Sequence, residues 1–560
     1  MIMLAMVSAL NLVAPWMVGA IVDHIAEGTL NRTILLHTVG LLVITGLTIY
    51  VLRYLWRLLL YSASYQLGSM LRQRLYQHWL TQPAAFFNEY GSGDLMARAT
   101  NDVTAVEMSA GEAILALFDG VLVGFMVLGV MFFAIDWRLA AITLIPWPIM
   151  AFTFWKINNQ LHDAFTRAQG RFSDLNDQTL EQISAIRLLR AYGLEQRSVE
   201  QFKESAGEAQ RANLEVAATE AKYDPVIFLT MGVSFLIALS FGGWLIASAE
   251  LTVGELTKFT LYLGQLIWPM FAYGWLLNLL ERGRVAYERI DKILQTTPAI
   301  TFAGDKQPKQ PLSLSWDIKS FSYPGHGGTV LKDLKGKLDA GKTLGIVGET
   351  GAGKSTFVQL LGRLYESSNA QFELGDVSLA DIDQESFRRL LAFVPQESFL
   401  FSTNIADNIA LGQPNAAKED IEKAAELAVI DEDIASFPEQ YSTPVGERGI
   451  TLSGGQKQRM AIARLMLMDS SIVVLDDALS AVDVATEQRI LANLRKVRDK
   501  RTTIIVSHRL SAVEEADEII VLKNGTSIEQ GNHDQLMALN GWYADMYRYQ
   551  QLEKAVEEGR

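Results

Sequence analysis

The stretch Gly348-Glu-Thr-Gly-Ala-Gly353-Lys354-Ser355 decides the fold of the second half of this 560-residue chain. It matches the phosphate-loop pattern G-x-x-x-x-G-K-[ST] in full. The apolar run Leu344–Val347 before it predicts a strand, and Phe357–Leu361 after it predicts a helix. Glycines let backbone N–H groups turn towards phosphate oxygens, and the helix adds its positive N-terminus. The stretch therefore predicts an α/β domain that holds a nucleotide by its phosphates.

A second element supports this prediction about 120 residues later. The apolar run Ile472–Leu475 predicts a buried strand, and Asp476 and Asp477 end it. A carboxylate at the carboxyl end of such a strand faces the phosphate loop. We therefore expect Lys354 to reach the β and γ phosphates, and Ser355 and Asp476 to hold Mg²⁺.

The first half of the chain is far more apolar than the second. A bilayer core about 30 Å thick needs about 20 mostly apolar residues as a helix. Six segments qualify as predicted spans, and they are Met1–Val22, Thr33–Leu60, Ile114–Ile135, Leu139–Phe154, Val226–Ala247 and Phe259–Leu280.

The connections between these spans alternate between short and long. Nine Lys or Arg residues lie between Lys156 and Lys222, whereas Ser248–Thr257 has none. The positive-inside rule then places the long connections and both chain ends in the cytosol. Apolar residues at spacings of three, among them Leu180 and Ile183, predict that helices continue into these connections. Ordinary soluble loops are the alternative.

Composition excludes several classes of protein. The net charge is −14 and no dense Lys/Arg block appears, so we expect no nucleic-acid partner. The chain has no cysteine, which excludes disulfides, cysteine-ligated metals and a Cys-His peptidase domain. The first basic residue is Arg32, so Met1–Val22 reads as a span and not as a signal peptide. The chain starts abruptly, inside or at the edge of that span.

The domain organisation follows from these patterns. We expect a transmembrane domain at residues 1–292, a linker at 293–312, a nucleotide-binding domain at 313–550 and a tail at 551–560. The linker is polar and contains two prolines and a glycine in TFAGDKQPKQPL, which is typical of a joint between domains.

Between the two nucleotide motifs lies Leu452-Ser-Gly-Gly-Gln456, and here the chain resembles the ABC (ATP-binding cassette) exporters of the half-transporter type. Tyr323 matches the aromatic residue that stacks on adenine, and Gln396 and His508 match two residues that sense the γ-phosphate. Val445–Gly449 resembles the element that contacts the cytosolic helices of the membrane domain. Within this family the chain looks like the bacterial multidrug-resistance-like members.

The resemblance implies a fold class and a set of site residues. The fold is a polytopic helical membrane domain of six spans with long cytosolic extensions, plus an α/β P-loop NTPase domain with a helical subdomain. The cofactors are ATP and Mg²⁺. The implied residues are, for ATP, Tyr323, Gly348, Glu349, Thr350, Gly351, Ala352, Gly353, Lys354, Ser355 and Thr356; for Mg²⁺, Ser355, Gln396 and Asp476; for catalysis, Asp477, His508 and Gln396; for the signature, Leu452, Ser453, Gly454, Gly455 and Gln456; and for the D-loop, Ser480, Ala481, Val482 and Asp483.

Asp477 departs from the family pattern. Active family members resemble one another in a Glu at this position, which polarises the attacking water. Asp is one methylene shorter, and a general base must come within hydrogen-bond reach of its proton. The resemblance then implies a heterodimer, in which this chain's intact signature completes the active site of a partner that carries the Glu. The alternative is that Asp477 still works, slowly.

Three functions remain open at this point. The first is export of an amphipathic drug, lipid or peptide across the bacterial inner membrane, with the nucleotide-binding domain in the cytosol. The others are a homodimeric lipid flippase or drug pump, and a regulatory ATP-binding subunit. Glu112 and Asp119 near the third span are either hydrated at its cytosolic end or functional. Aromatic residues such as Trp268 and Trp275 receive no role, because packing explains them equally well.

Overall fold

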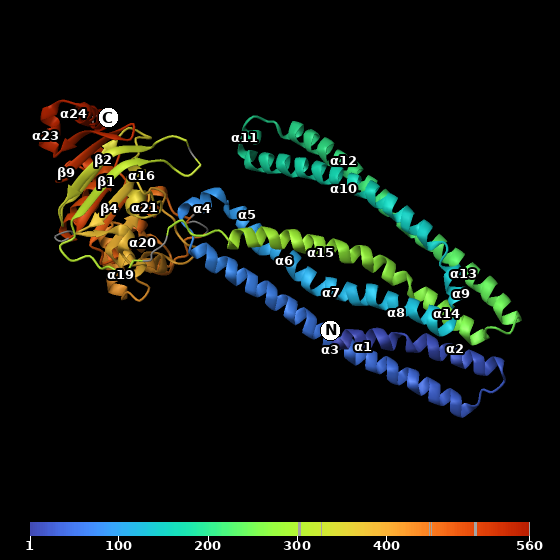
Figure 1. The fold of residues 1–560 in the computed structure, drawn as a ribbon. Helices are drawn as coiled ribbons and strands as arrows, with labels where there is room; N and C mark the ends of the chain where they lie inside the picture. The colour runs from blue at the N-terminus through green and yellow to red at the C-terminus, as the bar shows by residue number, and fades with distance from the viewer. Residues whose placement is uncertain (301–303, 326, 447–448, 450, 498–500, 559–560) are drawn as a thin grey trace. The chain divides into compact units, whose positions relative to one another are not determined.

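The computed structural model describes residues 1–300, 304–325, 327–446, 449, 451–497 and 501–558. The chain divides into two compact units. A helical unit contains residues 1–77 and 95–295, and a mixed α/β unit contains residues 78–94 and 296–560. Figure 1 shows both units along the chain, and each is described by itself.

Long helices make up the helical unit. Its helices are α1 (Ile2–Asn11), α2 (Val13–Ala26), α3 (Arg32–Leu80), α5 (Ser92–Ala97), α6 (Val103–Met108), α7 (Ile114–Ala116), α8 (Val123–Gly129), α9 (Trp137–Thr143), α10 (Trp147–Ser184), α11 (Ile186–Ala191), α12 (Glu195–Glu220), α13 (Tyr223–Ala247), α14 (Val253–Gln265) and α15 (Ile267–Leu294). Wider π-helical turns join α5 to α8 and follow α8, at η1 (Arg98–Asp102), η2 (Ser109–Ala113), η3 (Leu117–Leu122) and η4 (Val130–Ile135).

Five helical stretches of the described residues are long and apolar enough to cross a membrane. They are Ile2–Ala26, Arg32–Leu80, Ser92–Ile135, Trp137–Ser184 and Glu195–Ala247. The sixth predicted span, Phe259–Leu280, is not among them. It falls on α14 and α15, where polar residues such as Gln265 and Asn278 lower the mean hydropathy of the segment. Six spans therefore remain a prediction.

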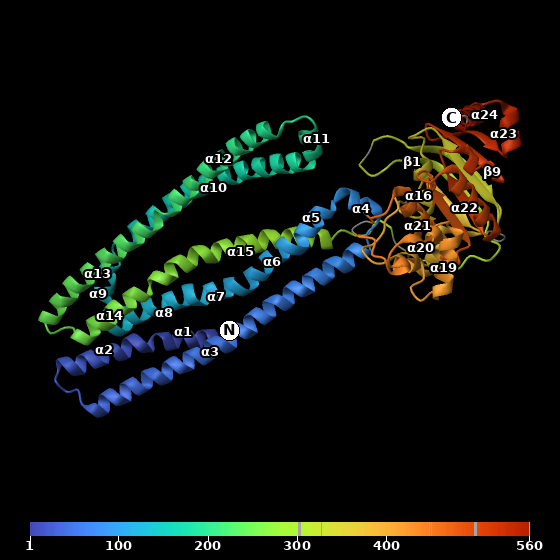
Figure 2. The ribbon, with the colours of Figure 1, turned by 180° about the vertical axis from the view of Figure 1, so that it is seen from behind.

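The long connections are helical, as predicted. α3 contains 49 residues and α10 contains 38, which is well beyond the length that a bilayer requires. α10 and α12 lie side by side in both views (Figures 1 and 2). The helical pattern breaks at Ala185, so the predicted series of apolar residues continues into the separate helix α11.

Two sheets form the centre of the mixed unit. Their strands are β1 (Leu314–Phe321), β2 (Leu331–Leu338), β3 (Thr343–Gly348), β4 (Ala370–Leu374), β5 (Val377–Ser378), β6 (Leu391–Val394), β7 (Ile472–Asp476), β8 (Thr502–Val506), β9 (Glu518–Lys523) and β10 (Thr526–Gly531). The antiparallel sheet has the order β2-β1-β4-β5, and the larger sheet has the order β10-β9-β3-β8-β7-β6.

In the larger sheet, β6, β7, β8, β3 and β9 run parallel. Every residue of β3, β7 and β8 is buried. Continuous apolar strands of this kind are typical of parallel sheets that are covered on both faces. The predicted strands before Gly348 and Asp476 are therefore confirmed as β3 and β7.

Helices surround these sheets. They are α4 (Ala84–Glu89), α16 (Lys354–Leu361), α17 (Gln384–Leu390), α18 (Ile405–Ile409), α19 (Lys418–Leu427), α20 (Asp431–Ser436), α21 (Gly454–Leu467), α22 (Val484–Val497), α23 (His533–Leu539) and α24 (Trp542–Glu558), with short 3₁₀ turns at η5 (Leu379–Asp381), η6 (Ala410–Gly412), η7 (Gln440–Ser442) and η9 (Leu510–Ala512). Within this unit α19 and α20 lie at the end opposite α23 and α24 in both views (Figures 1 and 2). Glu447 and Arg448 of the predicted Val445–Gly449 element lie outside the described residues.

Candidate functional site

The phosphate loop connects β3 to α16 through backbone conformations that favour glycine. Gly348 has φ +146° and Gly353 has φ +99°. A Cβ on Gly348 would lie 2.1 Å from the carbonyl oxygen of Leu522, and one on Gly353 would lie 2.5 Å from the Leu331 side chain. The segments around Leu331 and Leu522 therefore lie too close to this loop for side chains at these two positions. As a result, backbone atoms line the site.

Lys354 begins α16 and is buried. Its Nζ donates to the carbonyl oxygens of Gly348 and Glu349, both at 2.9 Å. Burial lowers the pKa of Lys354, while the nearby carboxylates of Asp477 and Asp476 act in the opposite direction. The ammonium group is thus held across the loop, where it can meet a phosphate.

The Ser355 hydroxyl donates to Asp476 Oδ1 at 2.9 Å. Asp476 is 2% exposed, and burial raises the pKa of its carboxyl, as does the charge of Asp477. The Ser355 hydrogen bond and Lys354 lower that pKa. A hydroxyl and a buried carboxylate in contact form an oxygen-only pair, which suits a small hard cation such as Mg²⁺.

Sheet topology brings the other predicted residues to the same edge. β3, β8, β7 and β6 are neighbours, so the residues that follow their carboxyl ends lie next to one another. Asp477 follows β7 and donates its backbone N–H to Val506 of β8 at 2.9 Å. His508 follows β8, and Gln396 follows β6 with an exposed side chain.

The side chains at this edge influence one another electrostatically. Partial burial lowers the pKa of His508, the charge of Lys354 lowers it further, and Asp477 raises it. Asp477 itself has φ +49°, a left-handed conformation that Asp tolerates better than most residues. Lys354, Asp476, Asp477 and His508 therefore form one cluster beside the phosphate loop.

Tyr323 lies against α16. Its hydroxyl is 2.9 Å from the Thr356 hydroxyl and donates to Gln359 Oε1 at 3.0 Å. Its ring meets Tyr365 edge-on, with centroids 4.9 Å apart. Burial raises the pKa of Tyr323. The predicted adenine-stacking residue is thus fixed beside the last residue of the predicted ATP-binding stretch.

The signature forms the start of α21. Ser453 accepts from the backbone of Gln456 at 3.2 Å, and Gln456 Oε1 accepts from the backbone of Ser453 at 2.9 Å, which is a complete capping box. Gln456 also donates to Asp433 at 2.8 Å. Ser453 and Gly454 remain exposed, so the positive end of α21 is open to solvent.

The signature helix and the D-loop are hydrogen-bonded to each other. Gln458 of α21 donates to the Ser480 hydroxyl and accepts from the backbone of Ala481, both at 2.9 Å. A Cβ on Gly455 would lie 2.8 Å from the Ala481 carbonyl oxygen. No hydrogen bond within the described residues joins the signature to the phosphate loop.

Sequence reasoning missed three residues that hold these loops. Glu487, 1% exposed, pairs with Arg509, which also donates to the Val482 carbonyl of the D-loop at 2.9 Å. Gln550 of α24 donates to the His508 carbonyl at 2.8 Å and accepts from the Leu510 backbone at 2.9 Å. Only the position of Arg509 directly after His508 was a signal in the sequence.

The sequence analysis also did not predict the short helix α4. This helix belongs to the mixed unit, far along the chain from the rest of that unit. Asn88 of α4 donates to the Tyr365 hydroxyl at 2.7 Å. A cavity of about 870 Å³ lies between this helix and the Tyr323 loop. Tyr365 thus contacts both α4 and Tyr323, the predicted adenine-stacking residue. In the sequence, Pro83 and Gly91 could have indicated where α4 begins and ends.

Comparison with known proteins agrees with this geometry. The family described as "ABC transporter transmembrane region" matches residues 1–270, and the family "ABC transporter" matches residues 331–480. The chain is 43% identical over 556 residues to the multidrug resistance-like ATP-binding protein MdlA of Escherichia coli (strain K12), covering 99% of this chain and 94% of that protein.

Two further similarities extend over almost the whole chain. The probable multidrug resistance ABC transporter ATP-binding/permease protein YheI of Bacillus subtilis (strain 168) is 36% identical over 561 residues, covering 100% of this chain and 96% of that protein. A solved structure of a bacterial Atm1-family ABC exporter with ATP bound superimposes with a TM-score of 0.81 and 25% identity, covering 98% of this chain and 97% of that one.

These similarities show the class: a membrane protein with the exporter architecture of a helical transmembrane domain and an ATP-binding domain. The chain belongs to the ABC transporter family.

Proposed function

We propose that this chain is one half of a heterodimeric ATP-driven exporter of the bacterial inner membrane. Its ATP-binding domain lies in the cytosol, and its cargo is an amphipathic or hydrophobic small molecule, lipid or peptide. The similarity to two multidrug resistance proteins over nearly the full chain supports export. The helix α3 runs without a break through residue 77, where the first segment of the helical unit ends in the chain, and this continuity supports a mechanical link from the membrane helices to the ATP-binding domain.

The phosphate-loop cluster supports ATP binding at the chain's own site. Backbone N–H groups between Gly348 and Ser355 hold the phosphates, and Lys354 leaves its two carbonyl partners to pair with them. Tyr323 offers a ring to the adenine. Ser355 and Asp476 hold Mg²⁺, with Gln396 at the same sheet edge. When bound, Mg²⁺ neutralises charge on the phosphate oxygens.

Asp477 is the observation that carries the proposal of a heterodimer. It follows β7, and its charge acts on both Lys354 and His508, which supports a role in orienting the attacking water. Its carboxylate is one methylene shorter than that of Glu, so it holds water poorly against a phosphate. We therefore assign slow hydrolysis to this site, which acts mainly by binding ATP.

The intact signature supports the second part of the proposal. Ser453 and Gly454 present an exposed, capped helix N-terminus, which attracts an anion. In a dimer of cassettes this surface faces the γ-phosphate on the partner. The main hydrolytic site then consists of the partner's phosphate loop and this chain's Leu452–Gln456.

Purification of the tagged chain from its native membrane tests the proposal. We expect a second half-transporter in equal amount, with Glu at the position equivalent to Asp477. In that complex Lys354→Ala should weaken labelling of this chain by photoreactive ATP. Recovery of this chain alone, as a dimer with strong ATPase activity, would instead support a homodimeric flippase or drug pump. A complex that binds ATP and transports nothing would support the regulatory subunit.

A further inference from the structure

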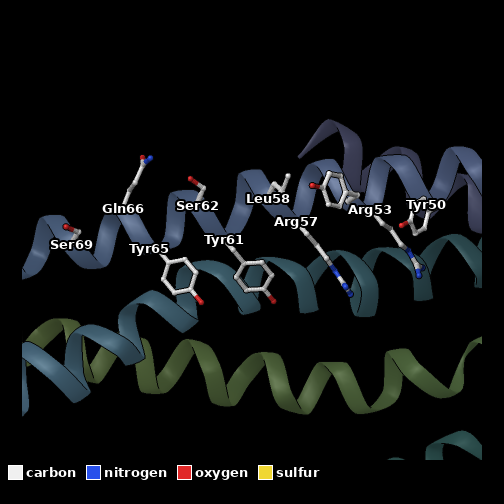
Figure 3. A pocket seen from close by; sticks show the side chains of 10 residues that line it. Tyr50, Arg53, Arg57, Leu58, Tyr61, Ser62, Tyr65, Gln66 and Ser69 are labelled. Atoms are coloured by element: carbon white, nitrogen blue, oxygen red, sulfur yellow. The ribbon is translucent and has the colours of Figure 1, made fainter.

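One face of α3 carries a row of tyrosine and arginine side chains. Tyr50, Arg53, Arg57, Tyr61 and Tyr65 recur at intervals of three or four residues, which places them on one side of a helix. They line an open cavity of about 860 Å³ along α3, and all ten residues that line it belong to this helix. In Figure 3 the arginines and the two later tyrosines point away from α3 towards the neighbouring helices.

The same two arginines line a second cavity of about 350 Å³. This cavity is completed by polar residues from other helices, namely Asn11 of α1, Asp119 of η3 and Gln265 of α14. Arg53 and Arg57 therefore connect the tyrosine-lined cavity to a polar recess inside the helical unit. An arginine that only anchors a helix at the membrane surface would face lipid head groups instead.

The charges of the recess are unbalanced. Arg53 and Arg57 are always ionised, and Asp119 is the acidic residue of this lining. The charge of each arginine acts on Asp119, yet no ion pair within 4.0 Å joins either arginine to a carboxylate of the described residues. Both guanidinium groups thus keep free donors, which fit a phosphate or carboxylate in a fork geometry.

A buried donor without a partner lies in the same recess. Trp56 is 5% exposed and lines the recess, and its indole Nε1 has no hydrogen-bond partner among the described residues. An indole N–H is a donor only, so an acceptor oxygen, charged or neutral, would satisfy it. The Trp56 indole is therefore compatible with the oxygen-rich ligand that the arginines favour, and the arginines alone carry the argument for its negative charge.

The depth of the arginines suits the head group of an amphiphile. Arg53 follows the first residue of α3, Arg32, by 21 residues, or about 31 Å of helix. That distance is about the thickness of the hydrocarbon core, so the arginines lie where an inner-leaflet head group would be. Tyrosines combine an apolar ring with a polar edge, and they can cover the body of such a molecule.

We propose that Arg53 and Arg57 bind the anionic head group, phosphate or carboxylate, of an amphiphilic cargo. Tyr61 and Tyr65 cover its apolar part, and the Trp56 indole N–H supplies a further donor. The inference rests on the proposed export function, because it names the class of cargo. It assigns the cargo a negative charge, whether the molecule is a membrane lipid or an amphiphile from the cytosol.

Measuring the binding of amphiphilic probes tests this inference. The protein is the complex purified from the native membrane, placed in nanodiscs of neutral phosphatidylcholine. The probes are dodecyl phosphate, dodecyltrimethylammonium with the same chain, and inorganic phosphate. We expect dodecyl phosphate to bind, inorganic phosphate to compete weakly and the cation not to bind. Displacement by phosphatidic acid in the nanodisc would identify a lipid as the source of the head group, and its failure to displace would identify a soluble amphiphile.

Variants on α3 provide the control. Arg53→Gln together with Arg57→Gln should weaken dodecyl phosphate binding about tenfold or more. Arg57→Lys should retain part of it. Arg74→Gln, an exposed arginine of the same helix outside both cavities, should leave it unchanged. Photoreactive ATP labelling should stay normal in all three, which shows that the complex is folded.

The two proposals fail in different ways. Equal binding of dodecyl phosphate to the double variant and to Arg74→Gln, or equal binding of the cationic probe, overturns the anionic site. Dodecyl phosphate that binds through the arginines but is never moved by ATP leaves the site standing and overturns export.

Discussion

The side-chain amide of Gln550 donates to the backbone carbonyl of His508 at 2.8 Å, and its oxygen accepts from the backbone of Leu510 at 2.9 Å. A residue of α24 therefore holds both sides of the loop that carries His508, the residue predicted to sense the γ-phosphate. Tyr547 of the same helix bonds Glu514 at 2.8 Å, which adds a second attachment. Motion of α24 is thus coupled to the position of His508.

We expect Gln550→Ala to loosen this loop. The Leu510 amide loses its acceptor, so hydrogen exchange in the peptide that contains it should become faster, and the domain should lose about 1 kcal/mol of unfolding free energy. Glu553→Gln on the same helix is the control, because Glu553 is exposed. Unchanged exchange at Leu510 in Gln550→Ala would contradict the coupling.

Two substitutions can separate the role of Ser453 as the N-cap of α21 from its proposed contact with a phosphate. Ser453→Ala removes the N-cap of α21 and should cost about 1 kcal/mol of stability as well as ATPase activity. Ser453→Asp keeps a good cap but places a carboxylate where an anion is expected. We therefore expect Ser453→Asp to unfold at a temperature near that of the wild type and yet to abolish most ATPase activity of the complex. Normal activity in Ser453→Asp would exclude a phosphate contact at this end of α21.

The contact between Gly455 and the D-loop gives a further prediction. A Cβ on Gly455 would approach the Ala481 carbonyl to 2.8 Å, and that carbonyl is backbone, so the loop must shift. Gly455→Ala should disturb the two bonds that Gln458 makes to Ser480 and Ala481. We expect reduced ATPase activity together with faster hydrogen exchange at Ala481. Gly454→Ala is the control for the hydrogen exchange alone, since its nearest contact would be 3.6 Å, and it should leave exchange at Ala481 unchanged.

Local spacing allowed the sequence to predict the nucleotide site. The phosphate loop, the strand before Asp476 and the signature are each contiguous, and each needs only its own residues to be recognised. Gln550 and His508 are 42 residues apart, and nothing in either segment indicates that they meet. Such contacts depend on tertiary packing, which a motif does not record.

For the membrane helices, the sequence predicts the spans but not the residues that meet inside them. The mean hydropathy of about 20 residues identifies an apolar helix, but it does not show which face of the helix carries the polar residues. Arg53 and Arg57 fall inside the predicted span Thr33–Leu60, and only the structure brings them together with Asp119. The aromatic and amide residues of Phe259–Leu280 lower its hydropathy, so length and composition do not identify it as a sixth span.

The lowered pKa of His508 predicts a pH dependence. Because the folded pKa lies below the ordinary value of about 6.5, the unfolded chain binds more protons in this range. His508 therefore contributes stability above pH 6.5, and this contribution is lost as the pH falls through the folded pKa. Nuclear magnetic resonance of the His508 ring should show titration below about 6.5 without nucleotide, and a shift upwards with ATP, whose phosphates favour the imidazolium.

Asp477→Glu should supply the longer carboxylate at the site that we propose to be slow in hydrolysis. In a complex whose partner site is inactivated, we expect ATPase activity to rise several-fold over the Asp477 form, because the added methylene brings the carboxylate closer to the attacking water. The gain has a cost, since φ at this position is +49° and Glu tolerates that conformation less well than Asp, by up to about 1 kcal/mol. Asp477→Asn is the matched control and should remain as slow as the native chain. If Asp477→Asn instead abolished a substantial activity, the native Asp477 would be a competent base, and the asymmetry between the two sites of the dimer would have to be abandoned.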